Sequence, residues 1–343
     1  MKKIEMQILY ELAKSRKSFW ELLDISHYTL RDFIETINNL YEEGSIAVDK
    51  DEVCLTDKGI KKVDQRSKNF ESRICEKCEG KRILFSGKFK EVLEQFEEIV
   101  KGRPTPNLEF YQGYMREYDV IARVALMQSY NDLVNKEFLL IGDDDLLSVA
   151  LSLTKLPSRV LVLDVDERLG EFIKKVNRNY GLEIEFQKYN VSDPLPKTLV
   201  GNFDVFSSEP LETTSGLKAF ISRGISCLRD EGVGYFGLTT AEASYKKWIN
   251  IQKILTRTNC VITDIIRGFS KYPMIYGSVN YEKFITKLKF PIKKNPGIYW
   301  YKSALFRFEV LGKPKLIMKP ERTLHITYID KKEDITHPMF YFS

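Results

Sequence analysis

The sequence has no run of eighteen apolar residues, only three histidines and only five cysteines. Without such a run no α-helix can span a membrane, and no apolar segment follows the first residues, so we expect a cytoplasmic protein without a signal peptide. An odd number of cysteines in a chain of 343 residues does not indicate a disulfide framework. The histidines, His27, His325 and His337, lie far apart in sequence, and none is a convincing general base.

A glycine-rich loop is also missing from the place where a nucleotide-binding fold usually has one. Residues 138–141 have the apolar character of a buried parallel strand, Gly142 provides the turn after it, and residues 146–153 begin a helix. Between the turn and the helix lie three consecutive acids: Asp143, Asp144 and Asp145. These carboxylates would repel a pyrophosphate, so an anionic cofactor is not expected. An alternative is that one of them, Asp143 in particular, is the N-cap of the helix and that its neighbours favour the positive end of the helix dipole. A cap needs only one side chain, however, so three consecutive acids indicate a cationic ligand.

The composition is that of an ordinary globular protein, with 43% hydrophobic and 29% charged residues and a length sufficient for more than one domain. Abundant lysine, isoleucine and glutamate with little glutamine are often found in thermophiles. The net charge is +5, and residues 271–320 hold eleven Lys or Arg against two acids. Such a stretch is either a solvated face or a patch for an anion or nucleic acid.

Residues 1–68 have the pattern of a winged-helix domain. Helices are predicted at 4–14, 19–23 and 28–43, and two short strands at 46–48 and 53–55. A third helix of this kind often reads DNA, but here it carries Arg31 against four acids: Asp32, Glu35, Glu42 and Glu43. Phosphates would be repelled by that surface, so we favour dimerisation or docking and consider a nucleic-acid partner unlikely.

Residues 69–108 are interpreted as a linker that contains a CxxC motif and a helix over 85–101. Cys75 and Cys78 form half of a zinc-ribbon signature, but the other three cysteines have no matching spacing. We therefore predict no metal site and keep Cys75 and Cys78 as weak candidates, with a site shared across a dimer as the alternative.

Residues 109–343 alternate between strand and helix patterns and end in a tail. Strands are predicted at 137–141, 159–163, 183–189, 203–207, 232–238, 261–267 and 304–311. Their crossovers predict an α/β fold with a doubly wound, Rossmann-like parallel sheet of the seven-stranded methyltransferase-like kind. The last strand is expected to be antiparallel, because no clear crossover helix precedes it.

Acidic residues follow most of these strands, where ligands of open parallel sheets bind. Asp164 lies about twenty residues beyond Gly142 and is predicted to bind the ribose hydroxyls, whereas Asp166 can instead cap the next helix. Asn190 follows the third strand at the usual adenine position. The residues themselves therefore predict a nucleoside site at Gly142, Asp164 and Asn190.

Glu209 and Glu212 follow the fourth strand and flank Pro210, which stiffens the turn. Either glutamate could bind an ammonium or accept its proton, and the alternative is a solvated turn. A sulfonium donor leaves as a neutral thioether, so an adenosine cleft ringed by carboxylates suits transfer to an amine.

Several motifs together resemble one family. They are Gln112-Gly113, residues 120–127, Gly142-Asp143-Asp144-Asp145, Asp164-Val165-Asp166, and Phe203-Asp204 leading to Pro210 and Glu212-Thr213. This combination is similar to the N(4)-bis(aminopropyl)spermidine synthases, the branched-chain polyamine synthases, over most of the chain. The resemblance implies a transferase that moves aminopropyl groups from decarboxylated S-adenosylmethionine to the secondary amine of spermidine and releases methylthioadenosine. Decarboxylated S-adenosylmethionine would be a co-substrate, with no tightly bound cofactor, and we expect a homodimer.

The resemblance also implies roles for individual residues. Asp143, Asp144 and Asp145 would line the amine site and act in catalysis with Glu209. Asp164 and Asp166 would hold the nucleoside, together with Gly142 and Asn190. The substrate-binding residues would be Gln112, Tyr114 and Glu212. Where the family usually has Asp-Pro-Pro-Glu-Thr, this chain has Glu209-Pro210-Leu211-Glu212-Thr213, and the longer acid could shift the reach of the carboxylate by about an ångström.

Two other functions are compatible with parts of the sequence. The first is an S-adenosylmethionine-dependent methyltransferase acting on RNA or DNA, suggested by the winged-helix pattern and the basic stretch. An acidic cleft and the lack of an Asn/Asp-Pro-Pro-aromatic corner argue against it. The second is a non-catalytic, ligand-sensing regulator, which the altered turn at Glu209 permits.

Overall fold

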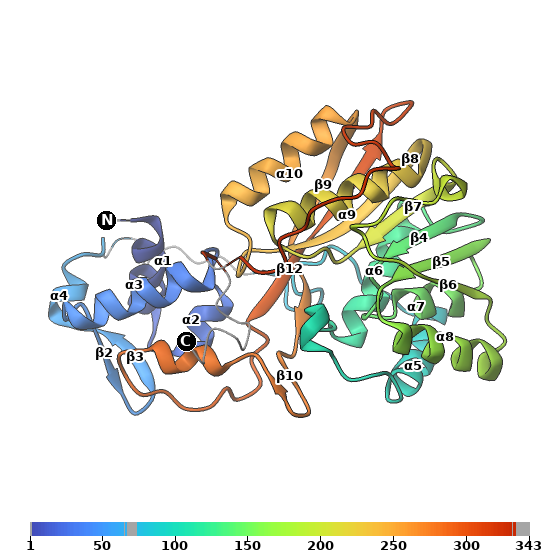
Figure 1. The fold of residues 1–343 in the computed structure, drawn as a ribbon. Helices are drawn as coiled ribbons and strands as arrows, with labels where there is room; N and C mark the ends of the chain where they lie inside the picture. Colours follow the sequence, from blue (N-terminus) through green and yellow to red (C-terminus); the bar gives the residue numbers. More distant parts are fainter. Residues whose placement is uncertain (1, 65, 67–73, 331, 334–343) are drawn as a thin grey trace.

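The computed structural model describes residues 2–64, 66, 74–330 and 332–333. The predicted boundary at residue 68 and most of the tail after residue 330 lie outside these ranges. An N-terminal unit of helices and short strands packs beside a larger α/β domain (Figure 1).

The described part of the N-terminal unit combines four α-helices with a three-stranded antiparallel sheet of order β1-β3-β2. Its elements are α1 (Lys3–Lys14), β1 (Lys17–Ser18), α2 (Phe19–Asp24), α3 (Leu30–Glu42), β2 (Ile46–Asp49), β3 (Glu52–Leu55) and the short α4 (Asp57–Ile60). Ser18 and Thr29 start α2 and α3 by accepting hydrogen bonds from backbone N–H groups in the first turn. The predicted helices and strands of this unit agree with these bounds to within two residues.

The α/β domain is built on a seven-stranded sheet of order β6-β5-β4-β7-β8-β12-β9. The strands are β4 (Glu137–Ile141), β5 (Arg159–Asp164), β6 (Ile184–Lys188), β7 (Phe203–Ser208), β8 (Leu228–Thr239), β9 (Cys260–Tyr272) and β12 (Tyr301–Val310). Strands β4 to β8 pair in parallel, and β12 is antiparallel to both β8 and β9. The predicted α/β fold with a mostly parallel sheet is confirmed, including its antiparallel last strand.

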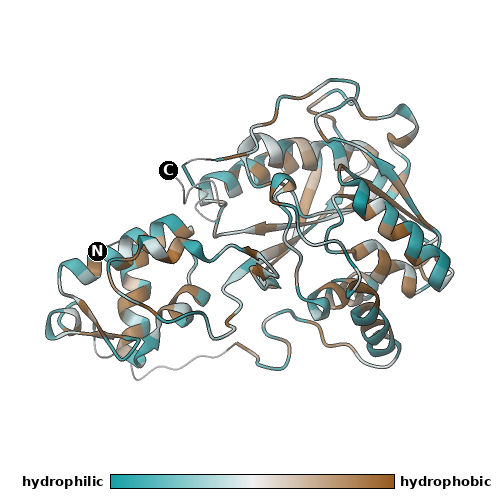
Figure 2. Ribbon diagram, turned by 60° about the horizontal axis from the view of Figure 1, so that its bottom comes forward, coloured by the Kyte–Doolittle hydropathy of each residue, from teal (hydrophilic) through white to brown (hydrophobic). Residues whose placement is uncertain are grey.

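Helices cover both faces of this sheet. One apolar core joins the sheet to α5 (Lys88–Val100), α6 (Glu117–Ser129), α7 (Leu147–Leu153) and α8 (Glu167–Tyr180), and a second joins it to α9 (Thr214–Cys227) and α10 (Tyr245–Arg257). Alternate residues of β4 show the division, because Phe138 and Leu140 enter the first core and Leu139 and Ile141 the second. In Figure 2 the strands are largely brown and the outer helix faces teal, as this layering requires.

Shorter elements complete the domain. The hairpin of β10 (Ile275–Tyr276) and β11 (Val279–Asn280) and a 3-10 helix at Lys283–Lys287 lie between β9 and β12, and two further 3-10 helices lie at Leu108–Phe110 and Lys197–Leu199. The segment after β11 returns to the N-terminal unit. There Trp20 donates a hydrogen bond to the carbonyl of Lys293 (3.0 Å), and the amide of Asn38 donates to that of Lys287 (2.9 Å). The core of the N-terminal unit is thereby continuous with the first core of the sheet.

Within the described ranges, no helix combines the length and apolar character needed to cross a membrane.

Candidate active site

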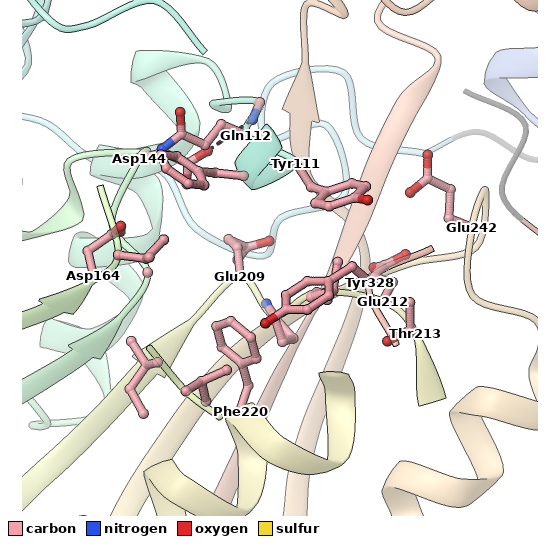
Figure 3. Close-up of a pocket in the computed structure, with 18 of the residues that line it drawn as sticks. Tyr111, Gln112, Asp144, Asp164, Glu209, Glu212, Thr213, Phe220, Glu242 and Tyr328 are labelled. Atoms are coloured by element: carbon pink, nitrogen blue, oxygen red, sulfur yellow. Dashed lines mark hydrogen bonds between the residues drawn. The ribbon is translucent and has the colours of Figure 1, made fainter. Parts of the chain in front are cut away.

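A cavity of about 580 Å³ opens at the carboxyl ends of β4, β5, β7 and β8. Seven acidic residues line it, against Lys247 as the one basic residue among the described lining residues. The acids are Glu109, Asp144, Asp164, Glu209, Glu212, Glu242 and Asp330. In Figure 3, Asp144 and Asp164 lie on one side of Glu209, and Glu212 and Glu242 lie on the other. Such a surface attracts a cation and repels phosphate.

The three consecutive acids have three different positions. Gly142 (φ +78°) turns the chain after β4, and Asp143 accepts hydrogen bonds from the backbone N–H (3.2 Å) and hydroxyl (2.5 Å) of Ser148 in the first turn of α7. Asp145 is buried and accepts from the backbone N–H of Met115 (2.6 Å). Asp144 alone of the three lines the cavity. Asp143 therefore supports the first turn of α7, although the N-cap position itself is Leu146. All three acids were expected to line the amine site, but Asp143 and Asp145 are not among the residues that line the cavity.

Burial and neighbouring carboxylates shape the acidity of this turn. Burial raises the pKa of Asp144, and the nearby charge of Glu209 adds to that effect, although Asp144 accepts a hydrogen bond from the backbone N–H of Gly113 (2.9 Å). Burial likewise raises the pKa of both Asp143 and Asp145 well above the usual range. A cation bound beside Asp144 would stabilise its ionised form.

Asp164 and Asp166 have different positions, one in the cavity wall and the other at the start of a helix. Asp164 lines the cavity and accepts hydrogen bonds from the backbone N–H groups of Asp143 (3.0 Å) and Asp166 (2.8 Å). Burial raises its pKa to about 6. Asp166 lies behind the cavity wall and is the N-cap of α8, which confirms the capping alternative. It also accepts a hydrogen bond from the side-chain amide of Gln112 (3.0 Å), which holds that cavity residue in place.

Glu209 lines the cavity but is already ion-paired. The guanidinium of Arg123, which is buried, lies 2.6 Å from one carboxylate oxygen, and the hydroxyl of Tyr272 donates to the other (2.7 Å). Space for this glutamate comes from Gly237 of β8, where a Cβ atom would lie 1.9 Å from a carboxylate oxygen of Glu209. The longer acid in this turn is therefore accommodated by a glycine on the neighbouring strand.

Glu212 also lines the cavity, but unlike Glu209 its carboxylate pairs with no arginine among the described residues. It accepts hydrogen bonds from the backbone N–H (2.5 Å) and the hydroxyl of Thr239. Burial is the main cause that raises its pKa to about 7, and the charge of Glu209 contributes in the same direction. A carboxylate of this kind is suited to accept a proton near neutral pH.

The remaining predicted residues differ in their placement. Asn190 lines the cavity and accepts hydrogen bonds from the backbone N–H (3.0 Å) and hydroxyl (2.8 Å) of Ser192. Tyr114 is not among the lining residues. Its ring packs against Tyr276 and lies 3.2 Å from the guanidinium carbon of Arg103. Of the predicted site residues, the cavity brings together Gln112, Gly142, Asp144, Asp164, Asn190, Glu209 and Glu212.

Sequence reasoning missed the residues that close the cavity from the far end of the chain. Tyr328 and Asp330 line it, and Asp330 is held by an ion pair with Lys247 of α10 (2.9 Å), which also lies 3.2 Å from Glu333. Tyrosines of β9 and β12, Tyr272 and Tyr301, complete the wall. No local motif marks these positions, because their placement depends on long-range contacts. The pairing of β9 with β12 brings Tyr272 and Tyr301 together, and the ion pair with Lys247 holds Asp330.

Cys75 is exposed and Cys78 partly buried. Hydrogen bonds from the backbone N–H groups of Cys78 and Lys77 lower the pKa of the Cys75 thiol. Among the residues that the structure describes, no group of three or more His, Cys, Asp or Glu side chains could hold a metal ion.

The chain is similar to known proteins over most of its length. Residues 91–334 match the family described as the branched-chain polyamine synthase A C-terminal domain. The N(4)-bis(aminopropyl)spermidine synthases of Thermococcus kodakarensis and Methanocaldococcus jannaschii are each 41% identical, over 85% of this chain and 83% of theirs. The crystal structure of the Thermus thermophilus branched-chain polyamine synthase in complex with N4-aminopropylspermidine and 5'-methylthioadenosine matches with a TM-score of 0.80 at 30% identity, and covers 95% of this chain and 92% of that one. This chain therefore belongs to the branched-chain polyamine synthase family.

Proposed function

We propose that this protein transfers aminopropyl groups from decarboxylated S-adenosylmethionine to the secondary amine of spermidine, giving a branched polyamine and methylthioadenosine. The observation that carries this proposal is the row of carboxylates along the cavity at the strand ends. Both expected ligands are cationic, one a sulfonium and the other a polyamine, and the related Thermus thermophilus structure holds an aminopropylated polyamine and methylthioadenosine.

The nucleoside of the donor is assigned to Gly142, Asp164 and Asn190. Asp164 is ionised above its pKa of about 6 and can then accept hydrogen bonds from the two ribose hydroxyls. Asp166 supports this end of the cavity from behind through Gln112. The donor is consumed as a co-substrate, and no tightly bound cofactor is proposed.

The chemical step is a displacement at carbon. The lone pair of the amine nitrogen attacks the methylene carbon attached to the sulfonium. The C–N bond forms as the C–S bond breaks, its electron pair goes to sulfur, and the amine proton passes to a carboxylate. Asp144 and Glu212 are the proposed contacts of the amine, because they line the cavity and no cation pairs with them among the described residues. Glu209, neutralised by Arg123, is proposed to fix the position of the reacting groups, and Asp143 and Asp145 to hold the turn.

We further propose that the N-terminal unit is a winged helix used for docking and not for reading DNA. The side-chain oxygen Oδ1 of Asn38 on α3 accepts a hydrogen bond from the backbone N–H of Lys289 (2.8 Å), and the ring centroid of Tyr41 lies 5.0 Å from that of Phe290. One face of the helix that would enter a major groove is thus covered by the same chain. A homodimer is also proposed, and light scattering of the purified protein tests it.

The test of the proposed reaction is incubation with decarboxylated S-adenosylmethionine and spermidine, followed by mass analysis. We expect mass increments of one or two aminopropyl groups and an equal amount of methylthioadenosine, and Asp144→Ala should lose at least about a hundredfold in rate. Glu171→Ala, which removes an exposed carboxylate of α8 that pairs with Lys174, is the control. The absence of these products together with methyl transfer from ordinary S-adenosylmethionine would overturn the proposal.

A further inference from the structure

A second hollow, with a volume of about 340 Å³, lies between α9 and α10 on the face of the sheet away from α5 and α6. It is lined by four cations and no acid. The cations are Lys218 of α9 and Lys247, Lys253 and Arg257 of α10. Its charge is the opposite of that of the acidic cavity, and the proposed reaction uses none of its residues except Lys247, which stands in the wall of both.

Three of these cations have no charged partner. Within the described part of the chain, Lys218, Lys253 and Arg257 are exposed and make no ion pair, whereas Lys247 is paired with Asp330 and Glu333. Because these side chains are exposed, solvent screens their mutual repulsion, and together they create a local positive potential that attracts an anion. Asn250 and Thr214 add hydrogen-bonding groups to the lining.

The floor of the hollow is apolar. Leu217, Ile251 and Ile254 form it, and Ile317, 36% exposed, closes one side from the segment that follows β12. On α10 the lining residues recur at spacings of three and four, so they share one helix face. The dark red C-terminal segment runs along α9 in Figure 1, held there by hydrogen bonds from Arg223 to the carbonyls of Pro320 and Arg322 (2.6 Å to Arg322).

We propose that this hollow binds an oligophosphate ligand with an apolar or planar part, the chemistry of a nucleoside triphosphate. The unpaired cations would meet the phosphates, since Arg and Lys are the usual partners of phosphate oxygens. The isoleucine and leucine side chains would pack against the base. The four cations would repel a polyamine. Inorganic oligophosphate would meet the cations but has no apolar or planar group to pack against the apolar floor.

The test measures binding of guanosine triphosphate and inorganic tripolyphosphate to the full chain by calorimetry at low and at moderate salt. We expect both to bind, the nucleotide several-fold more tightly because of the apolar floor, and both to weaken steeply as salt rises. Lys253→Glu combined with Arg257→Glu should weaken binding of each probe at least tenfold. The acidic cavity repels triphosphate and so does not compete for these probes.

The matched control is Lys88→Glu combined with Lys175→Glu. These lysines are exposed on α5 and α8, so this pair changes the net charge equally but far from the hollow. The control pair should bind both probes within twofold of wild type, and Lys218→Gln, a milder change in the hollow, should weaken them severalfold. Absence of binding at low salt, or equal loss in both double variants, overturns the proposal. So does a single-stranded oligonucleotide that binds the same residues more tightly than the nucleotide, which would make the surface a nucleic-acid site.

Discussion

The carboxylates of the acidic cavity differ in their ion-pair and hydrogen-bond partners. Glu209 is neutralised by Arg123, and Asp164 accepts two backbone N–H groups. Glu212 accepts its hydrogen bonds from Thr239 among the described residues, and its pKa of about 7 leaves it partly protonated near neutrality. Cation binding therefore competes with protons at Glu212 near neutral pH.

Spermidine binding should strengthen as pH rises from about 6 to 8. Glu212 has a pKa of about 7 in the folded protein, so it holds its proton below that pH, and a bound cation favours the ionised form. Binding should therefore release protons at pH 6 and almost none at pH 8, which calorimetry in buffers of different ionisation enthalpy measures. Glu212→Gln should remove this part of the pH dependence, and Glu98→Gln at an exposed pair should not. The same pH dependence in Glu212→Gln would show that another group is responsible.

Gly237→Ala should lower kcat by about tenfold to a hundredfold, because the added Cβ would displace the carboxylate of Glu209. Steady-state kinetics test this, and Gly102→Ala, whose Cβ would meet its nearest atom at an ordinary 3.5 Å, is the control. Shortening the acid with Glu209→Asp in the Gly237→Ala background should restore part of the activity. No recovery in the double variant would mean that the two positions act independently.

At the scale of elements, the strands of the sheet were predictable because their apolar patterns are local. Strand β4 has the predicted bounds, but β9 extends to Tyr272 and β12 begins at Tyr301, beyond the predicted ends. Their extra residues pair with each other (Tyr301 with Tyr272), an antiparallel contact that no local pattern contains. The directions of the Asp143 and Asp145 side chains could not be predicted from the sequence either, because they are set by hydrogen bonds from Ser148 and Met115.

A buried ion cluster joins α6, β9 and the loop before α5. Asp119 of α6, fully buried, pairs with Arg116 (2.8 Å) and Lys81 (3.4 Å) and accepts from the backbone N–H of Lys271 (2.8 Å). Glu79 contacts the same three cations. Loop, helix and strand are thus held together by charge at one point.

Asp119→Ala should lower the free energy of unfolding by about 3–5 kcal/mol. The fully buried Lys81 would lose one of its two carboxylates among the described residues and would share Glu79 with Arg116 and Lys271. Denaturant titration measures the change. Glu98→Ala, which breaks an exposed pair with Lys101, should change stability by less than about 1 kcal/mol. Equal effects of the two substitutions would contradict a special role for the cluster.

For the whole molecule, the N-terminal unit and the α/β domain share one apolar core. Trp20 is 2% exposed and lies near both Phe284 (6.1 Å between ring centroids) and Trp300 (6.5 Å). Removing the unit would expose these rings. We therefore expect the two parts to stabilise each other.

The protein should unfold in a single transition. Trp20→Ala should lower the free energy of unfolding by about 3–5 kcal/mol and shift that transition as a whole. Calorimetry, with Met6→Ala at a 40% exposed site as the control, distinguishes this from separate melting of the two parts. Two transitions in the wild-type protein would show that the shared core does not link them.

The acidic cavity is assembled from residues as far apart as Glu109 and Asp330. During synthesis, a chain that has emerged from the ribosome only as far as β12 already has its strand ends and most of its carboxylates, but lacks the wall that contains Tyr328 and Asp330. A nascent chain of this length offers a polyamine an open acidic surface without the wall that completes the cavity. Ligand capture should therefore follow the translation of residue 330, so that the substrate stabilises the finished fold without guiding its formation.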